Sequence, residues 1–386
     1  MKRISLFITV FLVLALFCGC GEKPAETTLS DPQNGSNNAI MGGLSVLKDG
    51  MIYFVAEGEN GGETISVMSE NGENEAVLYA PADALTMLSD LNCDGQALYF
   101  MERIFDTETR TVIEERICRY HLQSGELTTL HSATDKAWTC ITLHEDTLYF
   151  CENGFALMAM ATNGSEAPQK LLDFRGVYFI IHNDRIWPVS DFYKPGIDIV
   201  SYDLSGGDEQ VIHKGNTFVA IETIHNGRVY FNDYGIREGA VSKSIALDGS
   251  DEKKLSATFG YSCNPIGNTF YTAIEQNPEI ASNSDLTVTP STEELIQASP
   301  SDIRAETKDN ATASDLVTED RVPFAPGKLV IYVHELTAYG DLKRIDTKEY
   351  PSDNIFIQGL GCFSGEWRFY SIPEEGGGRS LHKEKM

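Results

Sequence analysis

Six cysteines follow the N-terminal segment, and their spacing limits the chemistry that they could perform. No two of them stand in a Cys-x-x-Cys pair, so a zinc knuckle or a redox dithiol has no support. If Glu145 and Asp146 form a two-residue hairpin turn, Cys140 lies directly across from Cys151, within reach of a disulfide. The sequence therefore predicts either a Cys140–Cys151 disulfide or two buried thiols packed side by side. The other four have no assignable partner: Cys93, Cys118, Cys263 and Cys362.

Three histidines stand just before a polar turn in successive repeats of the sequence: His144, His182 and His225. Because they belong to different repeats, we expect them to lie about one repeat apart in space. That separation far exceeds the Zn–N bond length of about 2.0–2.1 Å, so one zinc ion could not join them. We interpret them as turn residues produced by the repeat, and no metal site is predicted.

Acidic residues are abundant, but no pair of them is singled out by spacing. Glycoside hydrolysis depends on the separation of two carboxyl groups in space, which the sequence alone does not fix. The chain also contains no Asp-box phrase, no nucleophile elbow and no phosphate-binding glycine loop. No catalytic residue and no cofactor is therefore predicted.

A short phrase recurs along the chain, in which a polar turn is followed by an apolar run with adjacent aromatic residues. The copies lie at residues 49–54, 94–100, 145–150, 183–187, 226–231, 267–271 and 364–370. A second pattern follows the phrase, with two short strands around a polar turn that contains glycine, a strong hairpin signal. Together with the apolar run before each phrase, this gives four strands per repeat. Repeats of this length and composition predict an all-β fold, a β-propeller of four-stranded antiparallel blades.

The number of blades follows from the length of the repeating region. Residues 40–386, without the polar segment 275–327, provide about 42 residues for each of seven blades, within the typical range of about 40–45. Seven aromatic phrases also favour seven blades, although six or eight stay open. The last repeat stops near residues 380–382, so we expect ring closure to need a strand from the N-terminal side.

Composition and charge separate the polar segment from the rest and exclude one class of partner. Residues 275–327 are rich in Ser, Thr, Asp, Glu, Asn, Ala and Pro, which predicts a disordered acidic insertion within one blade; a linker between two domains is the alternative. The whole chain carries 30 basic and 57 acidic side chains. This balance argues against binding of nucleic acid, which needs Lys and Arg to neutralise phosphate. It is compatible with basic partners or with calcium in the propeller channel.

The N-terminal residues predict the compartment. Lys2 and Arg3 precede an apolar stretch at residues 4–17, which is too short to span a bilayer core of about 30 Å. Gly19 and Cys20 then form a lipobox-like end, so residues 1–19 are predicted to be a lipoprotein signal peptide and Cys20 the lipidated residue; an ordinary cleaved signal is the alternative. Residues 20–38 lack large apolar side chains and predict a flexible stalk, leaving residues 39–386 for the propeller. We expect an extracytoplasmic protein whose acyl chains, palmitate among them, hold it at the cell membrane.

The phrase Tyr230-Phe231-Asn232-Asp233, followed by residues 246–250, resembles the Tyr-Trp-Thr-Asp and Leu-Asp-Gly-Ser signatures of low-density-lipoprotein-receptor-type propeller repeats. Looser copies end in Glu102 and Glu152 in place of Asp. The chain thereby resembles bacterial lipoproteins with this type of propeller, over nearly all of its length outside the stalk and the insertion. The resemblance implies a role in protein interaction, and structural roles for Glu102, Glu152 and Asp233. It also implies six blades, which conflicts with the count of seven.

These observations lead to three expectations for function. The first is a non-enzymatic, lipid-anchored extracytoplasmic propeller that binds a protein, a peptide or an envelope polymer, because loops on a rigid scaffold carry function in such folds. The second is a surface-glycan hydrolase or lyase with its site at the mouth of the channel. The third is a structural subunit of an envelope complex.

Overall fold

The computed structural model describes most of the chain from residue 42 onwards. The described ranges are residues 42–59, 61–82, 85–173, 178–189, 198–215, 218–235, 239–256, 259, 262–266, 269–276, 328–337, 341–351, 362–364, 366–373 and 379–386. All regular secondary structure in these ranges is β-strand, which confirms the predicted all-β class.

The first three blades are four-stranded antiparallel sheets with their strands in chain order. Blade 1 contains β1 (Ser45–Lys48), β2 (Met51–Glu57), β3 (Glu63–Ser69) and β4 (Ala76–Tyr79). Blade 2 contains β5 (Thr86–Cys93), β6 (Ala97–Phe105), β7 (Val112–His121) and β8 (Leu127–Ala133). Blade 3 contains β9 (Trp138–His144), β10 (Thr147–Glu152), β11 (Ala156–Ala161) and β12 (Gln169–Asp173).

The next three blades repeat the same order, and a seventh sheet ends the chain. Blade 4 contains β13 (Phe179–His182), β14 (Arg185–Pro188), β15 (Ile199–Asp203) and β16 (Gln210–His213). Blade 5 contains β17 (Phe218–His225), β18 (Arg228–Gly235), β19 (Gly239–Ala246) and β20 (Lys253–Lys254). Blade 6 contains β21 (Ser262–Ile266), β22 (Thr269–Gln276), β23 (Lys328–Leu336) and β24 (Leu342–Pro351). Blade 7 contains β25 (Cys362–Ser364), β26 (Trp367–Pro373) and β27 (Arg379–Lys385).

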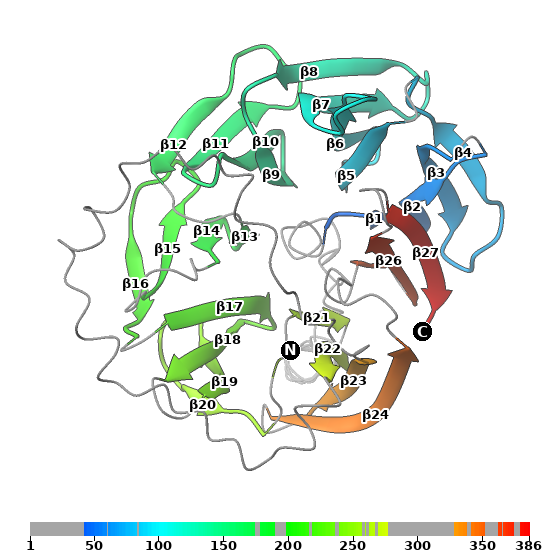
Figure 1. The fold of residues 1–386 in the computed structure, drawn as a ribbon. Helices are drawn as coiled ribbons and strands as arrows, with labels where there is room; N and C mark the ends of the chain where they lie inside the picture. Colours follow the sequence, from blue (N-terminus) through cyan, green and yellow to red (C-terminus); the bar gives the residue numbers. More distant parts are fainter. Residues whose placement is uncertain are drawn as a thin grey trace, which may run out of the picture.

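The described residues therefore form six complete four-stranded blades, and the expectation of seven such blades is wrong. The seventh aromatic phrase does form a sheet, but that sheet has only three strands among the described residues. Figure 1 shows the sheets arranged in a ring, with β26 and β27 returning beside β1 and β2. The predicted propeller architecture is thus confirmed, with a correction to the last blade.

Adjacent aromatic residues in the second strand of blade 5 pack against the blades on both sides. Successive side chains of a strand point to opposite faces of the sheet. In β18, the Tyr230 ring packs toward blade 6, with its centroid 4.9 Å from that of Phe270. The next residue, Phe231, packs toward blade 4, with its centroid 5.2 Å from that of His213. Both faces of a middle strand are therefore buried, which explains why these phrases are apolar without alternation.

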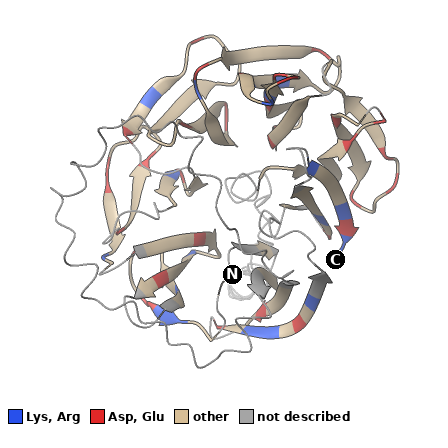
Figure 2. Ribbon diagram, in the orientation of Figure 1, with Lys and Arg blue, Asp and Glu red and all other residues tan. Residues whose placement is uncertain are grey.

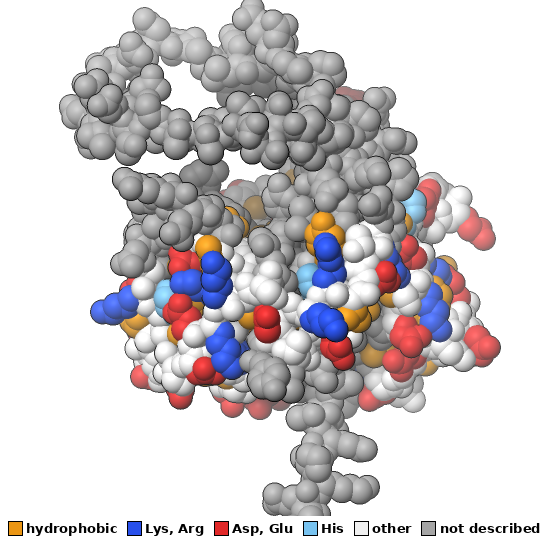
Figure 3. Space-filling view, turned by 90° about the horizontal axis from the view of Figure 1, so that it is seen from below, with side chains coloured by type: hydrophobic (Ala, Val, Ile, Leu, Met, Phe, Trp, Pro, Cys, Tyr) orange, Lys and Arg blue, Asp and Glu red, His pale blue; other side chains and the backbone are white. Residues whose placement is uncertain are grey.

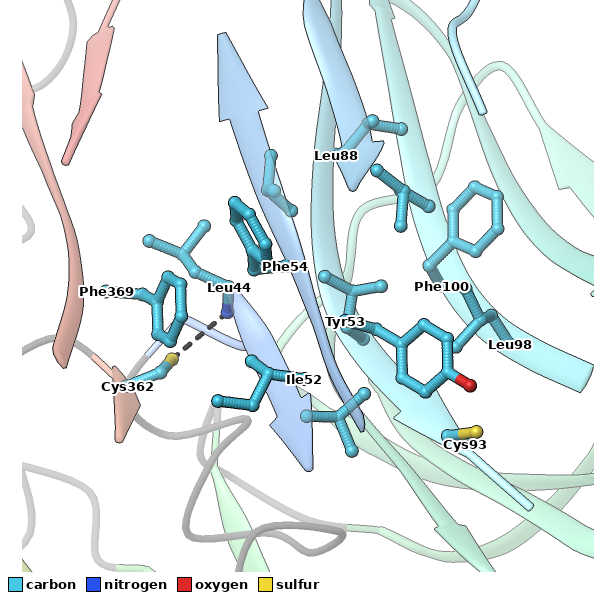
Figure 4. Packing of buried hydrophobic residues seen from close by; sticks show 14 of the residues in the cluster. Leu44, Ile52, Tyr53, Phe54, Leu88, Cys93, Leu98, Phe100, Cys362 and Phe369 are labelled. Carbon is cyan, nitrogen blue, oxygen red and sulfur yellow. Dashed lines mark hydrogen bonds between the residues drawn. The ribbon is translucent and has the colours of Figure 1, made fainter. Parts of the chain in front are cut away.

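Side-chain contacts close the ring between blade 7 and blade 1. The backbone N–H of Leu44 donates to Cys362 Sγ at 3.0 Å. The rings of Phe54 and Phe369 pack together with centroids 5.1 Å apart (Figure 4). No N-terminal strand completes blade 7 within the described residues, and residues 1–41 lie outside them. Within the described residues blade 7 thus packs directly on blade 1, and the expected closing strand stays a prediction.

The same arginine arrangement supports the outer turn of blades 4 and 5. Arg228 donates to the Ser244 carbonyl at 3.2 Å and to the Asp251 carboxylate at 2.8 Å. Arg185 makes the equivalent bonds to Ser201 at 3.0 Å and to Asp208 at 2.9 Å. The two arginines follow the Asn-Gly and Asn-Asp turns of the repeat. The recurring phrase therefore specifies the hydrogen bonds that hold the outer turn as well as a strand.

Several predicted segments lie outside the described residues: the signal peptide at residues 1–19, Cys20, the stalk at residues 20–38, and residues 277–327. Both flanks of the last segment belong to blade 6, because β22 and β23 are neighbouring antiparallel strands of one sheet. β22 extends to Gln276, two residues into the segment predicted as an insertion. No helix in the described ranges has the length and apolar character required to cross a bilayer.

Candidate functional site

The three acids predicted from the repeat occupy equivalent places near the ends of β6, β10 and β18. They belong to different blades, so the structure does not bring them together. Each carboxylate faces a basic side chain: Glu102 is paired with Arg116 at 3.7 Å, Glu152 with Lys136 at 2.9 Å and Asp233 with Lys243 at 2.8 Å. These ion pairs are compatible with the structural roles that the resemblance implies, which stay a prediction.

A buried carboxylate that the sequence reading missed joins blade 2 to blade 3. Glu115 on β7 is 2% exposed, and its Oε1 accepts a hydrogen bond from Arg103 Nε at 2.6 Å. Its Oε2 accepts the backbone N–H of Trp138, the first residue of β9, at 2.7 Å. The carboxylate thereby satisfies a backbone donor of the neighbouring blade, which would be costly to bury without a partner.

The equivalent residue of blade 1, Glu63, makes the same connection to blade 2 and also reaches blade 7. Glu63 Oε2 accepts the backbone N–H of Leu88 at 2.6 Å. Arg379 of β27 donates to both carboxylate oxygens, at 2.7 and 2.9 Å, and to the Leu88 carbonyl at 2.6 Å. Three blades therefore meet at one bidentate ion pair. The shared spacing Glu63-x-Ile65 and Glu115-x-Ile117 was the available sequence signal.

Three exposed apolar side chains flank equivalent loops of blades 2 and 3, and we call them the loop-face site: Val112, Ile113 and Phe155. Val112 and Ile113 begin β7, beside the turn at residues 106–111, and are 43% and 47% exposed. Phe155 ends the turn between β10 and β11 of the neighbouring blade and is 66% exposed. Val112 and Ile113 are successive strand residues and point to opposite faces of blade 2. Both stand beside the loop at residues 106–111, and loops on a rigid scaffold commonly carry binding functions.

Hydrogen bonds fix the turn that carries Phe155. The backbone N–H of Asn153 donates to the Ala137 carbonyl at 2.7 Å, and the Ala137 N–H donates to Asn153 Oδ1 at 2.8 Å. Lys136 pairs with Glu152 beside them. The exposed ring of Phe155 is thus held on a rigid support, which lowers the entropic cost of binding a partner.

The inner strands of blades 2 and 3 are joined by a polar side chain. Asn92 Nδ2 donates to the Ile141 carbonyl at 2.9 Å, and the Leu143 N–H donates to Asn92 Oδ1 at 3.0 Å. Asp90 is 5% exposed and has a left-handed φ of 54°. Its backbone is approached so closely that a Cβ on Gly43 would lie 2.3 Å from the Asp90 Cα, so only glycine fits at position 43.

Two carboxyl groups of the inner strands have raised pKa values, but they lie in different blades. Burial raises the pKa of Asp90 on β5 to about 7, although hydrogen bonds from Ser89 and Ile141 oppose the shift. Burial also raises the pKa of Glu222 on β17 to about 7, against a hydrogen bond from Asn232 Nδ2 at 2.8 Å. Neither carboxyl group contributes to the pKa shift of the other. The structure does not assemble them into one catalytic pair.

The predicted opposition of Cys140 and Cys151 is wrong. A bulge in β9 places Thr139 opposite Cys151, and Cys140 at the bulge has a left-handed φ of 58°. Both cysteines are buried free thiols in the structure, and Cys140 Sγ donates to the Phe179 carbonyl of blade 4 at 3.5 Å. The register was predicted for an unbroken hairpin, and the extra residue of the bulge shifts it.

We expect the buried thiols to resist alkylation in the folded protein. Cys93, Cys118, Cys140, Cys151 and Cys362 are all buried, and burial raises their thiol pKa values, to about 12 for Cys140 and Cys362. Because the thiolate is the reactive form, labelling should require unfolding. Peptide mapping after iodoacetamide treatment checks this. Labelling of Cys140 in the native protein would contradict the expected protection. Failure to label Cys140 and Cys151 after unfolding without reductant would show that the two residues form a disulfide.

The three histidines lie at the turn-facing ends of β9, β13 and β17, as the repeat predicts. His144 Nε2 is 3.0 Å from Asp184 Oδ1 in the next blade. Burial lowers the pKa of His182, and nearby His225 lowers it further. His225 packs edge-on against Phe270, with centroids 5.4 Å apart. In the described part of the chain, no group of three or more His, Cys, Asp or Glu side chains is arranged to hold a metal ion.

Comparison with solved structures finds similar folds at very low sequence identity. The oligogalacturonate lyase from Vibrio parahaemolyticus is 7% identical with a TM-score of 0.49, and the match covers 91% of this chain and 90% of that one. An oligogalacturonate lyase in complex with manganese is 10% identical with a TM-score of 0.48, covering 87% and 86%. A protein assigned as TolB from Agrobacterium tumefaciens is 14% identical with a TM-score of 0.32, and this chain spans 62% of its length. No protein-family model matches the chain, and no curated protein matches it significantly.

Proposed function

We propose that this chain is a non-enzymatic, lipid-anchored propeller outside the cytoplasm that binds a protein, a peptide or an envelope polymer. The loop-face site is the observation that carries the proposal. Val112, Ile113 and Phe155 expose apolar surface on two neighbouring blades that Glu115 and Asn153 hold in place. Cys20 would carry the lipid anchor, and the resemblance to receptor-type repeats supports a role in interaction.

Replacing Ile113 and Phe155 together by Ser should reduce recovery of a partner at least about tenfold, because anchoring aromatic residues contribute about 2 kcal/mol or more at interfaces. Recovery is measured by quantitative mass spectrometry after capture of the full-length protein from solubilised envelopes. Val77 provides the control, since it is 61% exposed on the outer strand β4, away from the loop-face site. If the Ile113/Phe155 variant and Val77→Ser recovered the same partners, the loop-face site would not be the binding surface.

A surface-glycan hydrolase or lyase is the second candidate, and Asp90 is the observation that favours it. A carboxyl group that keeps its proton near neutral pH can serve as a general acid. Such chemistry needs a second carboxylate about 5 to 9.5 Å away. The pH dependence of the protein's stability distinguishes a buried neutral acid at Asp90 from a ligand-binding anion.

A further inference from the structure

Four Asn-Gly pairs lie in turns that the structure describes, and they differ in how firmly the asparagine side chain is held. Such a pair is chemically reactive, because glycine has no side chain to hinder attack by its backbone nitrogen on the side-chain amide carbon of the asparagine. The pairs are Asn71-Gly72, Asn153-Gly154, Asn163-Gly164 and Asn226-Gly227. All four asparagines are exposed, so exposure alone does not separate them.

Hydrogen bonds hold the asparagine side chain in three of the four pairs. Asn71 Oδ1 accepts the backbone N–H of Glu73 at 3.1 Å, and Asn163 Oδ1 accepts the backbone N–H of Ser165 at 2.8 Å. Asn153 Oδ1 accepts the backbone N–H of the residue before β9 at 2.8 Å. An amide that is held in this way cannot rotate freely to bring its carbon against the next backbone nitrogen.

The glycines of these turns differ in the same sense. The Gly72 N–H donates to the Ser69 carbonyl at 2.7 Å, and the Gly164 N–H donates to the Ala161 carbonyl at 3.0 Å. Within the described ranges, the Gly227 N–H has no such acceptor. The space around Gly227 is open, since no atom lies within 4 Å of the position that a Cβ would occupy.

Asn226 and Gly227 form the two-residue turn between β17 and β18, with left-handed φ values of 48° and 72°. In the part of the chain that the structure describes, no hydrogen bond holds the Asn226 side chain. The Gly227 carbonyl accepts the Leu247 N–H at 3.2 Å, which engages the oxygen and leaves the nitrogen accessible. Asn226 therefore combines a mobile side-chain amide with an unbonded backbone nucleophile.

We propose that Asn226 is a site of spontaneous deamidation in the folded protein. The Gly227 nitrogen loses its proton to a base in the solvent and attacks Asn226 Cγ. The bond from Cγ to the side-chain nitrogen breaks, and ammonia leaves. Water then opens the succinimide ring at either of its two carbonyl groups. The products are aspartate, or isoaspartate, in which the backbone runs through the side-chain carbon. The reaction needs only water, and it does not depend on the proposed binding function.

The two products should affect blade 5 differently. Asp49 and Gly50 form the equivalent turn of blade 1, with φ values of 51° and 74°, so aspartate fits this turn. Asp and Glu already lie on turns and strands of several blades (Figure 2), and acidic and basic side chains are interspersed on the face shown in Figure 3. Isoaspartate adds one backbone carbon to a turn whose length sets the strand register. It should therefore weaken the pairing of His225 with Arg228.

Incubation of the full-length protein at pH 8 in water labelled with heavy oxygen, followed by peptide mapping, tests the proposal, because ring opening incorporates oxygen from the solvent. We expect Asn226 to deamidate at least about tenfold faster than Asn71, Asn153 or Asn163, the equivalent of 1.36 kcal/mol in activation free energy. After unfolding in urea the hydrogen bonds are lost, so the four rates should converge. In the Asn226→Gln variant, rapid labelling of this turn should disappear while labelling of the other three turns is unchanged.

Equal rates at the four asparagines of the folded protein would overturn the proposal, as would an unmodified Asn226 under conditions in which the unfolded protein reacts. The Asn226→Asp variant supplies the aspartate product directly, and it should unfold at nearly the same urea concentration as the unmodified protein. A marked loss of stability in this variant would contradict the different effects expected of the two products. Because the test does not involve the loop-face site, its failure would leave the proposed function standing on partner capture.

Discussion

Replacing Arg379 by Met is expected to lower the free energy of unfolding by about 3–5 kcal/mol, the usual cost of removing one partner from a buried ion pair. The side chains of Arg379 and Glu63 are each only 11% exposed. Without Arg379, the Glu63 carboxylate stays buried with only the Leu88 N–H to stabilise its charge. The same substitution also removes the contact between β27 and the Leu88 carbonyl, which ties blade 7 to blade 2. Urea denaturation followed by tryptophan fluorescence provides the measurement.

Two further variants show whether the effect comes from the buried charge. Glu63→Gln combined with Arg379→Met removes that charge while keeping an acceptor for Leu88, so the double variant should be more stable than Arg379→Met alone. Lys170→Met breaks an exposed pair with Asp173 and should cost at most about 1 kcal/mol. A loss of less than about 1 kcal/mol for Arg379→Met would mean that the ring does not depend on this ion pair.

The sequence predicted the parts of the fold that depend on local pattern. The aromatic phrases became the middle strands, as in β6, β10 and β18, because residues buried on both faces must be apolar throughout. The last repeat was predicted to stop early, and blade 7 has three described strands. The apolar pattern of a strand depends on the strands and blades directly beside it. It can therefore be predicted without knowing how the ring closes.

Contacts between blades could not be predicted in the same way. The bulge at Cys140 lies where the inner strands of neighbouring blades meet. The residues of its own hairpin contain no signal that predicts it. Glu63 and Arg379 are 316 positions apart, and only closure of the ring brings them together. The loop-face site was missed for a related reason, because exposed apolar residues resemble core residues in a sequence until burial is known.

Asp90 is expected to make the protein less stable as the pH rises from about 4 to about 7. Its pKa of about 7 in the folded protein lies above the ordinary value of 3.8. The folded state therefore holds this proton more tightly than the unfolded state does. The resulting stabilisation is complete below about pH 4 and is lost progressively up to about pH 7. With 1.36 kcal/mol for each pKa unit, the full loss is at most about 4 kcal/mol.

The Asp90→Asn variant isolates this contribution. Asn cannot ionise, so the variant should be more stable than the unmodified protein at pH 8, while the difference should shrink toward pH 4. Arg103 and Glu115 are the charged groups that act on Asp90, and neither is altered by the substitution. Glu222→Gln should show the same direction independently, since Glu222 lies in blade 5 and shares no partner with Asp90. Stability is measured by denaturant unfolding at several pH values. If Asp90→Asn proved less stable than the unmodified protein at pH 8, the ionised carboxylate would have to be stabilised in the folded state, as it would be by a bound cation or another ligand.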